Sequence, residues 1–372
     1  MKYYIIAGEH SGDLHASNLM KELKKRDASA DFRCWGGDLM QAEGAVLVKH
    51  IRDISFMGFS EVLMNIRTIM ANFKLCRADI LAYKPDVIIL VDYPGFNLRM
   101  AEFGHNQGIP VFFYISPQVW AWKKGRVKKI KAFVDRMFVI LPFEQDFYRS
   151  YDYHVDFAGH PLLDAIEQYR MSVNVTSFVK KNGLDERPVI AILPGSRHQE
   201  ISRMLNVMLQ VVPAFPAYQF VVAGTSNFDS GFYTKLLGNS GVKIVYGQTY
   251  DLLSNARAAL VTSGTATLET ALFGVPEVVC YRGSGISFQI AKRLVDIKYI
   301  SLVNLIMDKP VVTELIQSDL NLENLKKELK LILDDTDTIE RIKTDYNALR
   351  EKLGGSGASA KTAELMMHYL KK

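Results

Sequence analysis

The chain alternates between short, nearly continuous apolar runs and longer segments in which apolar residues recur at helical spacing. The runs in the first half are KYYIIAG, PDVIILVD, IPVFFYIS and RMFVILPF, and those in the second half are PVIAILPGS, YQFVVAG, VKIVYG, AALVTSG and PEVVCY. Runs of β-branched and aromatic residues without alternation are typical of strands buried on both faces. The pattern therefore predicts an α/β protein built on parallel sheets that helices cover.

A largely polar stretch separates the two sets of predicted strands. Residues 157–188 carry a strand only at their start, which places a domain boundary near residue 165. Two domains are also expected because 372 residues exceed the size at which one hydrophobic core usually stops growing. We therefore expect an N-terminal domain over residues 1–165, a C-terminal domain over 166–340, and C-terminal helices over 341–372 that can pack back on the N-terminal domain.

Composition narrows the class of protein. The three cysteines show no C-x-x-C spacing, which fits a reducing compartment and argues against a disulfide framework or a structural zinc site. The 45 basic and 40 acidic residues give a net charge of +5, which suits an anionic small molecule or an anionic surface. No nucleic-acid-binding signature, signal-peptide core or membrane-length apolar run is evident. We therefore expect a cytoplasmic protein that is soluble or peripheral to a membrane.

The stretch IIAGEHSGDLHA, residues 5–16, places a cluster of polar side chains directly behind the first predicted strand. A helix that starts near Ser11 or Asp13 would leave Glu9 and His10 on a loop at the carboxyl end of that strand. Ligands bind at such ends in open α/β sheets. Ser11 and Asp13 are equally typical helix caps, so the residues alone leave both interpretations open.

Two loops in the second half predict an anion site. In AILPGSRHQEI, residues 191–201, a strand gives way to a helix at Gly195, Ser196 and Arg197, which brings backbone N–H groups and a guanidinium together. This is not a Walker P-loop, since the required spacing is absent. In LVTSGTATLETALFGVP, residues 260–276, the sequence Ser263-Gly264-Thr265 begins a helix, and Glu269 follows one turn later on the same face. A carboxylate there suits ribose hydroxyls, or is simply favourable beside its helix dipole.

Asp92 follows the apolar strand in LVDYPGFN, residues 90–97, where a carboxylate can act as a general base or merely belong to a turn.

Two further segments predict a surface. The helix expected over residues 56–73 has more apolar positions than one core-facing stripe needs, and six of the nine residues from Lys123 to Lys131 are basic. The apolar surplus fits contact with lipid or with a partner, and the basic residues form a solvated helix face first and a phosphate or membrane contact second. We interpret the two segments together as one patch that rests on an anionic membrane.

A metal site is not predicted. His10 and His15 are five residues apart rather than the four that a helical ligand pair needs. The only D-x-D, at Asp335 and Asp337, lies in a polar segment between predicted helices and is interpreted as a loop.

Taken in order, the motifs of the chain resemble those of the lipid-A-disaccharide synthases. The motifs are GEHSGD, VDYPGFN, SPQVWAWKKGRVKKI, LPFE, GHPLLD, LPGSR, SGTATLE and YISLVNLI, and they run from residue 5 to about residue 306. The resemblance implies two Rossmann-like domains that face each other across a cleft, as in GT-B glycosyltransferases. It implies transfer of 2,3-diacylglucosamine from UDP-2,3-diacylglucosamine to 2,3-diacylglucosamine 1-phosphate (lipid X), which forms the β-1,6-linked lipid A disaccharide 1-phosphate and UDP, with inversion and without a metal or other cofactor.

The resemblance also assigns roles to individual residues. Arg197 would contact the diphosphate and Glu269 the ribose, and Asp92 would be the base. The family often shows a second Asp where this chain has Gly95, which leaves Asp92 as the only carboxylate of its loop. The expected donor-side residues are Gly195, Ser196, Arg197, Ser263, Gly264, Thr265, Glu269 and Asn304. The expected acceptor-side residues are Glu9, His10, Ser11 and Asp13.

The implied partners are the two acyl-sugar substrates and the inner face of the inner membrane of a Gram-negative cell, without nucleic acid. The sequence leaves the oligomeric state open, with a homodimer as one candidate. Three other classes of protein would need sequence features that this chain does not show. A UDP-sugar 2-epimerase shares the fold but would carry acidic and histidine signatures that are not evident here, a non-catalytic binding protein would need an export signal, and an α/β-hydrolase would need G-x-S-x-G.

Overall fold

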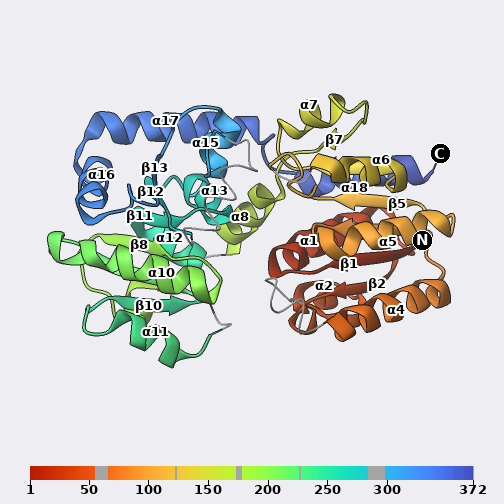
Figure 1. Cartoon of the computed structure of the whole chain (residues 1–372), viewed down its shortest axis with the longest axis horizontal. Coiled ribbons are helices and arrows are strands. Elements are labelled where there is room, and N and C mark those ends of the chain that lie inside the picture. Colours follow the sequence, from red (N-terminus) through yellow and green to blue (C-terminus); the bar gives the residue numbers. More distant parts are fainter. Residues whose placement is uncertain (55–65, 122–123, 173–177, 226–227, 284–297, 372) are drawn as a thin grey trace. The chain divides into compact units, whose positions relative to one another are not determined.

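The protein consists of two compact units. The chain forms most of the first unit, then the whole second unit, and returns to the first unit at its end. The computed structural model describes residues 1–54, 66–121, 124–172, 178–225, 228–283 and 298–371 (Figure 1). The first unit is formed by Met1–Glu167 together with Leu353–Lys372, and the second by Gln168–Lys352. The chain thus changes unit within α8 (Pro161–Ser172) and again directly after α17 (Thr336–Lys352), whereas the sequence placed its second boundary at residue 340.

In the described residues, the first unit contains a seven-stranded sheet in the order β3-β2-β1-β4-β5-β6-β7, and all neighbouring strands are parallel. Its strands are β1 (Lys2–Ala7), β2 (Asp31–Gly36), β3 (Val46–His50), β4 (Val87–Val91), β5 (Val111–Tyr114), β6 (Arg136–Val139) and β7 (Asp156–Phe157). The order 3-2-1-4-5-6 is that of a Rossmann sheet.

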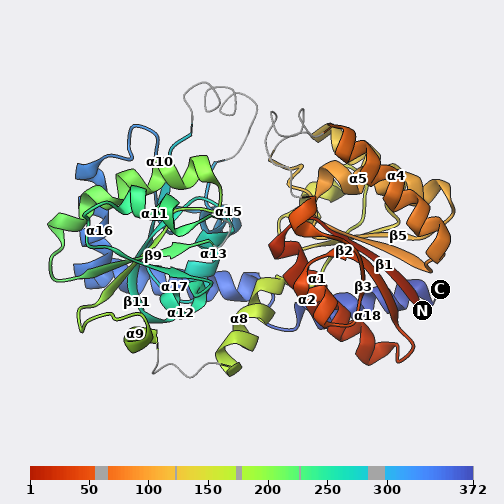
Figure 2. The same cartoon turned by 90° about the horizontal axis from the view of Figure 1, so that it is seen from below.

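Helices cover both faces of this sheet (Figure 2). The helices of this unit, among the described residues, are α1 (His10–Arg26), α2 (Asp38–Ala42), η1 (Ile51–Asp53), α4 (Ile66–Tyr83), α5 (Pro94–Asn106), η2 (Lys124–Arg126), α6 (Val127–Phe133), α7 (Glu144–Arg149), α8 and α18 (Ala358–Leu370). Tyr4 and Ile6 pack with α4, α5 and α6, while Tyr3 and Ile5 pack with α1 and α18. Both faces of β1 are therefore buried, which explains why its sequence is apolar without alternation.

The end of the chain is fastened to the first unit by hydrogen bonds. The carboxylate of Asp164, on α8, accepts the backbone N–H groups of Gly357, Ala358 and Ser359 at 2.6, 3.2 and 2.7 Å. N–H groups at the N-terminus of a helix have no acceptor within that helix. The side chain of Asp164, from a distant helix, therefore caps α18. The C-terminal helix consequently belongs to the first unit, although residues 173–352 of the second unit separate it from α8.

The second unit repeats the same design. Within the described part of the chain it holds a six-stranded parallel sheet in the order β10-β9-β8-β11-β12-β13. Its strands are β8 (Val189–Leu193), β9 (Gln219–Gly224), β10 (Lys243–Tyr246), β11 (Ala256–Thr262), β12 (Glu277–Tyr281) and β13 (Thr313–Ile316). Its helices are α9 (Phe178–Lys181), α10 (His198–Met208), η4 (Leu209–Ala214), α11 (Ser230–Leu237), α12 (Thr249–Asn255), α13 (Thr265–Leu272), α15 (Leu302–Met307), α16 (Leu322–Asp334) and α17.

The predicted fold class, two Rossmann-like parallel-sheet domains, is confirmed. The described residues also contain β2, β3 and β13, which the apolar pattern did not predict. Part of the helix expected over residues 56–73 lies outside the described residues, and α4 is described from Ile66 onward.

Candidate functional site

Each sheet has one point at which the order of its strands reverses. In the first unit this point lies between β1 and β4, where Ala7 pairs with Val91, and in the second between β8 and β11, where Leu193 pairs with Val261. Loops that leave two such strands diverge and open a crevice at their carboxyl ends, which is where ligands bind in this kind of sheet. The polar loops singled out in the sequence follow these four strands.

The loop after β4 holds Asp92 in a strained conformation. Asp92 and Tyr93 have φ values of 46° and 47°, in the left-handed region that residues other than glycine seldom adopt. The N–H of Asp92 donates to the carbonyl of Tyr114 at 3.1 Å, and the Asn97 amide donates to the carbonyl of Asp92 at 2.7 Å. Backbone strain of this kind persists only where surrounding contacts enforce it, and it clusters at functional sites.

The surroundings of Asp92 change its acidity. Burial, and secondly the nearby Glu9 carboxylate, raise the pKa of Asp92 to about 7. Both effects disfavour the charged form, since the carboxylate loses water and faces a like charge. A carboxyl group that titrates near neutral pH at a switch point is suited to accept a proton from a substrate hydroxyl.

Gly8 allows the loop after β1 to lie against the loop after β4. A Cβ atom at Gly8 would stand 2.2 Å from the Tyr93 ring, so only glycine fits beneath this side chain. The hydroxyl of Tyr93 donates to the carbonyl of Ile54 at 3.0 Å. Tyr93 thereby connects the loop after β4 to the loop after β1 and to the segment that follows β3.

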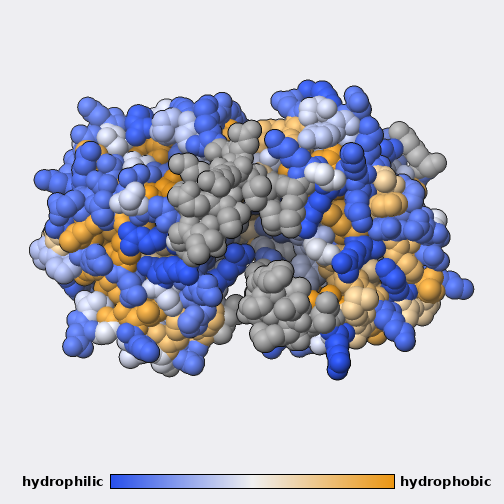
Figure 3. All heavy atoms as spheres, viewed as in Figure 1, coloured by the Kyte–Doolittle hydropathy of each residue, from blue (hydrophilic) through white to orange (hydrophobic). Residues whose placement is uncertain are grey.

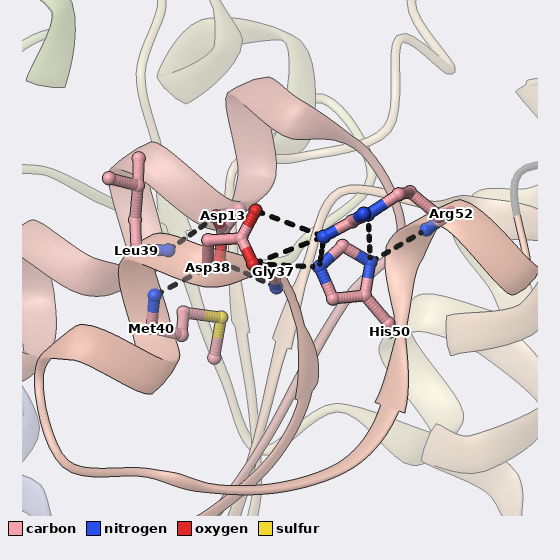
Figure 4. Close-up of polar contacts among 7 residues, drawn as sticks. All are labelled: Asp13, Gly37, Asp38, Leu39, Met40, His50 and Arg52. Atoms are coloured by element: carbon pink, nitrogen blue, oxygen red, sulfur yellow. Dashed lines mark hydrogen bonds and ion pairs between the residues drawn. The ribbon is translucent and has the colours of Figure 1, made fainter.

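The residues expected on the acceptor side fall into two groups. The helix α1 starts at His10 with Glu9 as its N-cap residue, so His10 and Ser11 lie in the first helical turn and are exposed, while Glu9 is half-buried. Asp13 differs from the expectation. It is 3 % exposed, and its carboxylate accepts the backbone N–H groups of Gly37, Leu39 and Met40 at 2.7, 3.1 and 3.1 Å (Figure 4). Asp13 therefore caps α2 from α1 and positions the loop that follows β2.

Replacing Asp13 by Asn should destabilise the first unit by about 1–2 kcal/mol, because an amide offers one acceptor atom and no charge to three buried N–H groups. All three tryptophans of the chain lie within residues 1–167, so tryptophan fluorescence during urea unfolding reports this unit. The exposed neighbour Asp38 provides the control, and Asp38→Asn should change stability by less than about 0.5 kcal/mol. Equal effects of the two variants would contradict the capping role.

In the second unit, a backbone N–H group of the loop after β8 is hydrogen-bonded to a carboxylate of the protein itself. Arg197 is exposed at the N-cap of α10, and Gly195 has a φ of +104°. The N–H of Ser196 donates to the Glu200 carboxylate at 3.1 Å, so a side chain from the first turn of α10 occupies part of the predicted anion site. A Cβ atom at Gly195 would lie 2.2 Å from that carboxylate, which explains the glycine. The sequence did not single out Glu200.

The loop after β11 presents backbone and a carboxylate. Gly264 is the N-cap of α13 with a φ of +155°, and both Gly264 and Thr265 are exposed. The hydroxyl of Ser263 donates to the carbonyl of Ile300 at 2.8 Å, which anchors the segment before α15. Because Leu193 pairs with Val261, the loops that follow these two strands are neighbours, as the prediction of one anion site requires.

Glu269 lies on the second turn of α13 and is half-buried. The hydroxyl of Tyr250 donates to its Oε1 atom at 3.3 Å, and the Tyr250 ring packs against Tyr169 and Phe273. Burial raises the pKa of the Glu269 carboxyl, and the hydrogen bond from Tyr250 opposes this shift. Tyr250 was missed in the sequence because 19 positions separate it from Glu269, and no local pattern connects them.

Asn304, expected on the donor side, makes its contacts within the protein. Its amide is 1 % exposed and donates to Val312 O at 2.9 Å and to Glu314 Oε1 at 3.0 Å. Its oxygen accepts the N–H groups of Val311 and Val312 at 2.8 and 3.0 Å. Four hydrogen bonds thus occupy both polar atoms of the amide, and Asn304 holds the turn before β13 instead of facing a ligand.

A mixed apolar and basic surface covers part of the first unit. The helix α4 packs on α5, and α5 packs on α6. On α4, the side chains of Met70, Leu75 and Leu81 are 57 %, 45 % and 49 % exposed. We call this the α4–α6 surface, and its exposed members are Arg67, Met70, Lys74, Leu75, Arg77, Leu81, Lys128, Lys129 and Lys131. Figure 3 shows hydrophobic side chains interspersed with hydrophilic ones over α4 and α5.

The described residues offer neither a metal cluster nor a membrane-spanning helix. In that part of the chain, no three His, Cys, Asp or Glu side chains are grouped so that they could hold a metal ion. None of the helices described there combines the length and the apolar character needed to cross a bilayer.

The sequence of the chain is similar to one family of known proteins over nearly its whole length. The family model described as lipid-A-disaccharide synthetase matches residues 3–368. A lipid-A-disaccharide synthase of Syntrophus aciditrophicus (strain SB) is 40 % identical over 376 residues, which cover 99 % of this chain and 97 % of that protein. A second, from Geobacter sulfurreducens, is 37 % identical over 375 residues, with the same shares covered.

Solved structures share the fold at low sequence identity. The UDP-GlcNAc 2-epimerase of Neisseria meningitidis, bound to UDP-GlcNAc, has a TM-score of 0.70 at 14 % identity, with 100 % of both chains covered. A glycosyltransferase of kitacinnamycin has a TM-score of 0.63 at 15 % identity, with 99 % of this chain and 98 % of that chain covered. This likeness concerns the architecture, which glycosyltransferases and epimerases of the GT-B type have in common.

Proposed function

Since the chain belongs to the lipid-A-disaccharide synthase family, we propose that it transfers 2,3-diacylglucosamine from UDP-2,3-diacylglucosamine to 2,3-diacylglucosamine 1-phosphate and releases UDP. The enzyme is a hexosyltransferase of lipid A synthesis. The observation that carries the assignment of its substrates is the pair of switch points. One presents a carboxylate that titrates near neutral pH, and the other presents exposed backbone with a guanidinium.

The second unit would bind the donor. Exposed backbone at Gly264 and Thr265 and the guanidinium of Arg197 are suited to the diphosphate, and these two loops leave neighbouring strands. Glu269, with one oxygen held by Tyr250, keeps its other oxygen as an acceptor for a ribose hydroxyl. The Glu200 carboxylate that accepts the N–H of Ser196 supports this assignment, since a phosphate oxygen is a similar acceptor and would compete for the same N–H group.

The first unit would bind the acceptor, with its attacking hydroxyl beside Asp92. Asp92 takes the proton of that hydroxyl as the new bond to the anomeric carbon of the donor forms. The bond from that carbon to the diphosphate breaks at the same time, and negative charge grows on the UDP that leaves. An α-linked donor and a β-linked product require a single displacement with inversion, which needs no covalent sugar–enzyme intermediate.

Release of UDP tests this function directly. The purified enzyme is incubated with UDP-2,3-diacylglucosamine, with and without the sugar 1-phosphate acceptor. We expect UDP release that depends on the acceptor, together with a disaccharide 1-phosphate that is detected by mass spectrometry. Conversion of the donor to its 2-epimer, or UDP release that ignores the acceptor, would overturn the proposal in favour of an epimerase or a hydrolase.

The α4–α6 surface would rest on an anionic membrane, where acylated substrates reside. Apolar side chains flanked by Lys and Arg are the composition of interfacial helices, and each cation near an anionic surface contributes about 1 kcal/mol. We therefore expect peripheral membrane association through the first unit. Exposed Met70, Leu75 and Leu81 are its apolar contacts.

The double variant Lys74→Glu/Lys128→Glu should bind vesicles of phosphatidylglycerol and phosphatidylcholine at least about tenfold more weakly than the unaltered protein, because two attractive charges become repulsive. Sedimentation of the protein with vesicles at low and high salt measures this, and binding should weaken as salt rises. The matched control, Lys327→Glu/Lys330→Glu, reverses two exposed charges on α16 of the second unit. Equal loss in both double variants, or no vesicle binding at low salt, would contradict the assignment.

A further inference from the structure

A cluster of charged side chains follows β2 and β3, outside the residues that the proposed mechanism uses. It consists of Asp38, at the start of α2, and of His50 and Arg52, at the end of β3 and in η1 (Figure 4). The Nη2 atom of Arg52 lies 3.2 and 3.3 Å from the two carboxylate oxygens of Asp38. The Nε2 atom of His50 lies 3.2 Å from one of the same oxygens. Two nitrogen donors therefore converge on one carboxylate.

The arrangement of the donors is built by the backbone of η1. The N–H of Arg52 donates to Nδ1 of His50 at 3.1 Å, so the proton of a neutral His50 ring is on Nε2, which faces the carboxylate. The backbone on either side of Asp38 is held from the other side, because the Asp13 carboxylate accepts the N–H groups of Gly37, Leu39 and Met40. Figure 4 shows both sets of contacts side by side, with Leu39 and Met40 on one side of Asp38 and with His50 and Arg52 on the other.

The carboxylate is nevertheless easily exchanged for another anion. The side chains of Asp38 and Arg52 are 74 % and 67 % exposed, and ion pairs between such side chains contribute little to stability. The other acidic group of this segment, Asp53, is paired with Lys49 at 3.7 Å and leaves the Arg52 guanidinium to Asp38. A phosphate group offers more oxygens and more charge to the same donors, and the guanidinium binds it in a forked geometry.

The cluster lies at the carboxyl ends of the strands, as Asp92 does. All strands of this sheet are parallel, and the residues paired at these ends include Gly36 with His50, and Ala7 with Val91. Three strand spacings, about 14 Å, separate β3 from β4, which Asp92 follows, and a long arginine side chain together with a sugar phosphate can span that distance. The hydroxyl of Tyr93, next to Asp92, bonds the carbonyl of Ile54, two residues after Arg52. The segment that carries the cations is thus tied to the loop that carries the base.

We propose that Arg52 and His50 form the subsite for the phosphate group of the acceptor, and that Asp38 occupies this subsite in the free enzyme. The inference rests on the proposed function, since it concerns the second substrate of that reaction. A ligand whose hydroxyl lies at Asp92 and whose anionic group lies at Arg52 is a sugar phosphate that spans the carboxyl ends of the first sheet. Binding of the phosphate breaks the contacts of Arg52 and His50 with Asp38 and replaces them by contacts with phosphate oxygens.

Acceptor kinetics of paired variants test this subsite. Arg52→Gln should raise the KM for the sugar 1-phosphate acceptor at least about tenfold while kcat stays within about twofold, as expected for lost ground-state binding of a charged group. Asp38→Asn should have the opposite effect and lower this KM, because the competing carboxylate is gone. A merely structural ion pair predicts a KM change of the same sign and size in both variants. Arg149→Gln removes an equally exposed arginine that pairs with Asp146 on α7, and it should change nothing.

The chemistry of the ligand is tested with an acceptor that lacks the phosphate. With 2,3-diacylglucosamine as acceptor, Arg52→Gln and the unaltered enzyme should have the same KM. Inorganic phosphate should inhibit the unaltered enzyme competitively against the phosphorylated acceptor, and inhibit Arg52→Gln less. The proposal fails if Arg52→Gln leaves the KM for the phosphorylated acceptor unchanged, or raises the KM of both acceptors equally. In either case acceptor-dependent UDP release by the unaltered enzyme still stands, so the proposed function is judged separately.

Discussion

Asp92→Asn is expected to lower kcat at least about a hundredfold and to leave the affinity for the UDP-sugar donor nearly unchanged. The variant keeps the shape of the side chain and loses only its capacity to accept a proton, and removal of a general base typically costs a factor of this size. The backbone contacts of the loop, from Tyr114 and Asn97, do not involve the side chain, so the strained turn should persist. Steady-state UDP release and donor binding by calorimetry provide the two measurements.

The pH profile of the same reaction carries an independent signature of this base. Since burial and Glu9 raise the pKa of Asp92 to about 7, kcat/KM should fall about tenfold for each pH unit below 7, as the free enzyme loses its base to protonation. Glu9→Gln removes the like charge and should move this acid limb to lower pH. Asp146→Asn, which alters an exposed carboxylate on α7, should leave it in place.

Two results would count against Asp92 as the base. One is an Asp92→Asn variant that turns over normally. The other is a variant that loses donor affinity and keeps its kcat, which would make Asp92 a binding residue and direct the search for the base to Glu9 or His10. A Glu9→Gln variant whose acid limb stays near pH 7 would show that Glu9 does not act on this carboxyl.

The strands that could be predicted from the sequence are those buried on both faces. The run VIILV of β4 is buried at every position, so its composition alone marks it as a strand between two layers of helices. The missed strands have mixed patterns. In β3 four of five residues are half-buried, and in β2 Arg33 is half-buried against Asp79, because these strands lie at or next to the edge of the sheet. Edge strands share their composition with loops and helices, and only their pairing identifies them.

The candidate site was predictable where its residues directly follow a strand. Asp92 and Arg197 leave the carboxyl ends of strands, so their place at a switch point follows once the order of the strands is known. Asp13 and Asn304 show the limit of this reasoning. Both are polar residues within motifs, but both hydrogen-bond to backbone groups of the protein. Asp13 accepts an N–H group 27 positions away, and Asn304 bonds the turn that follows its helix, so no local pattern predicts these partners.

Arg197→Ala is expected to lower turnover on the order of a hundredfold. The diphosphate gains negative charge as its bond to the sugar breaks, so a guanidinium placed against it binds the transition state more tightly than the donor in its ground state. Contacts of this kind typically supply about 3 kcal/mol. The exposed position of Arg197 at the N-cap of α10 leaves its guanidinium available to a ligand, next to the loop that begins α13.

The fold should tolerate this change, so a loss of turnover would report the loss of the guanidinium. The loop retains the hydrogen bond between the N–H of Ser196 and Glu200, and α10 keeps its buried face, which includes Ile201 and Leu205. Arg203→Ala, an exposed arginine further along the same helix, is the matched control and should turn over normally. Arg197→Lys keeps the charge without the forked geometry and should lie between the two. Near-normal turnover of Arg197→Ala with unchanged circular dichroism would remove Arg197 from the donor site.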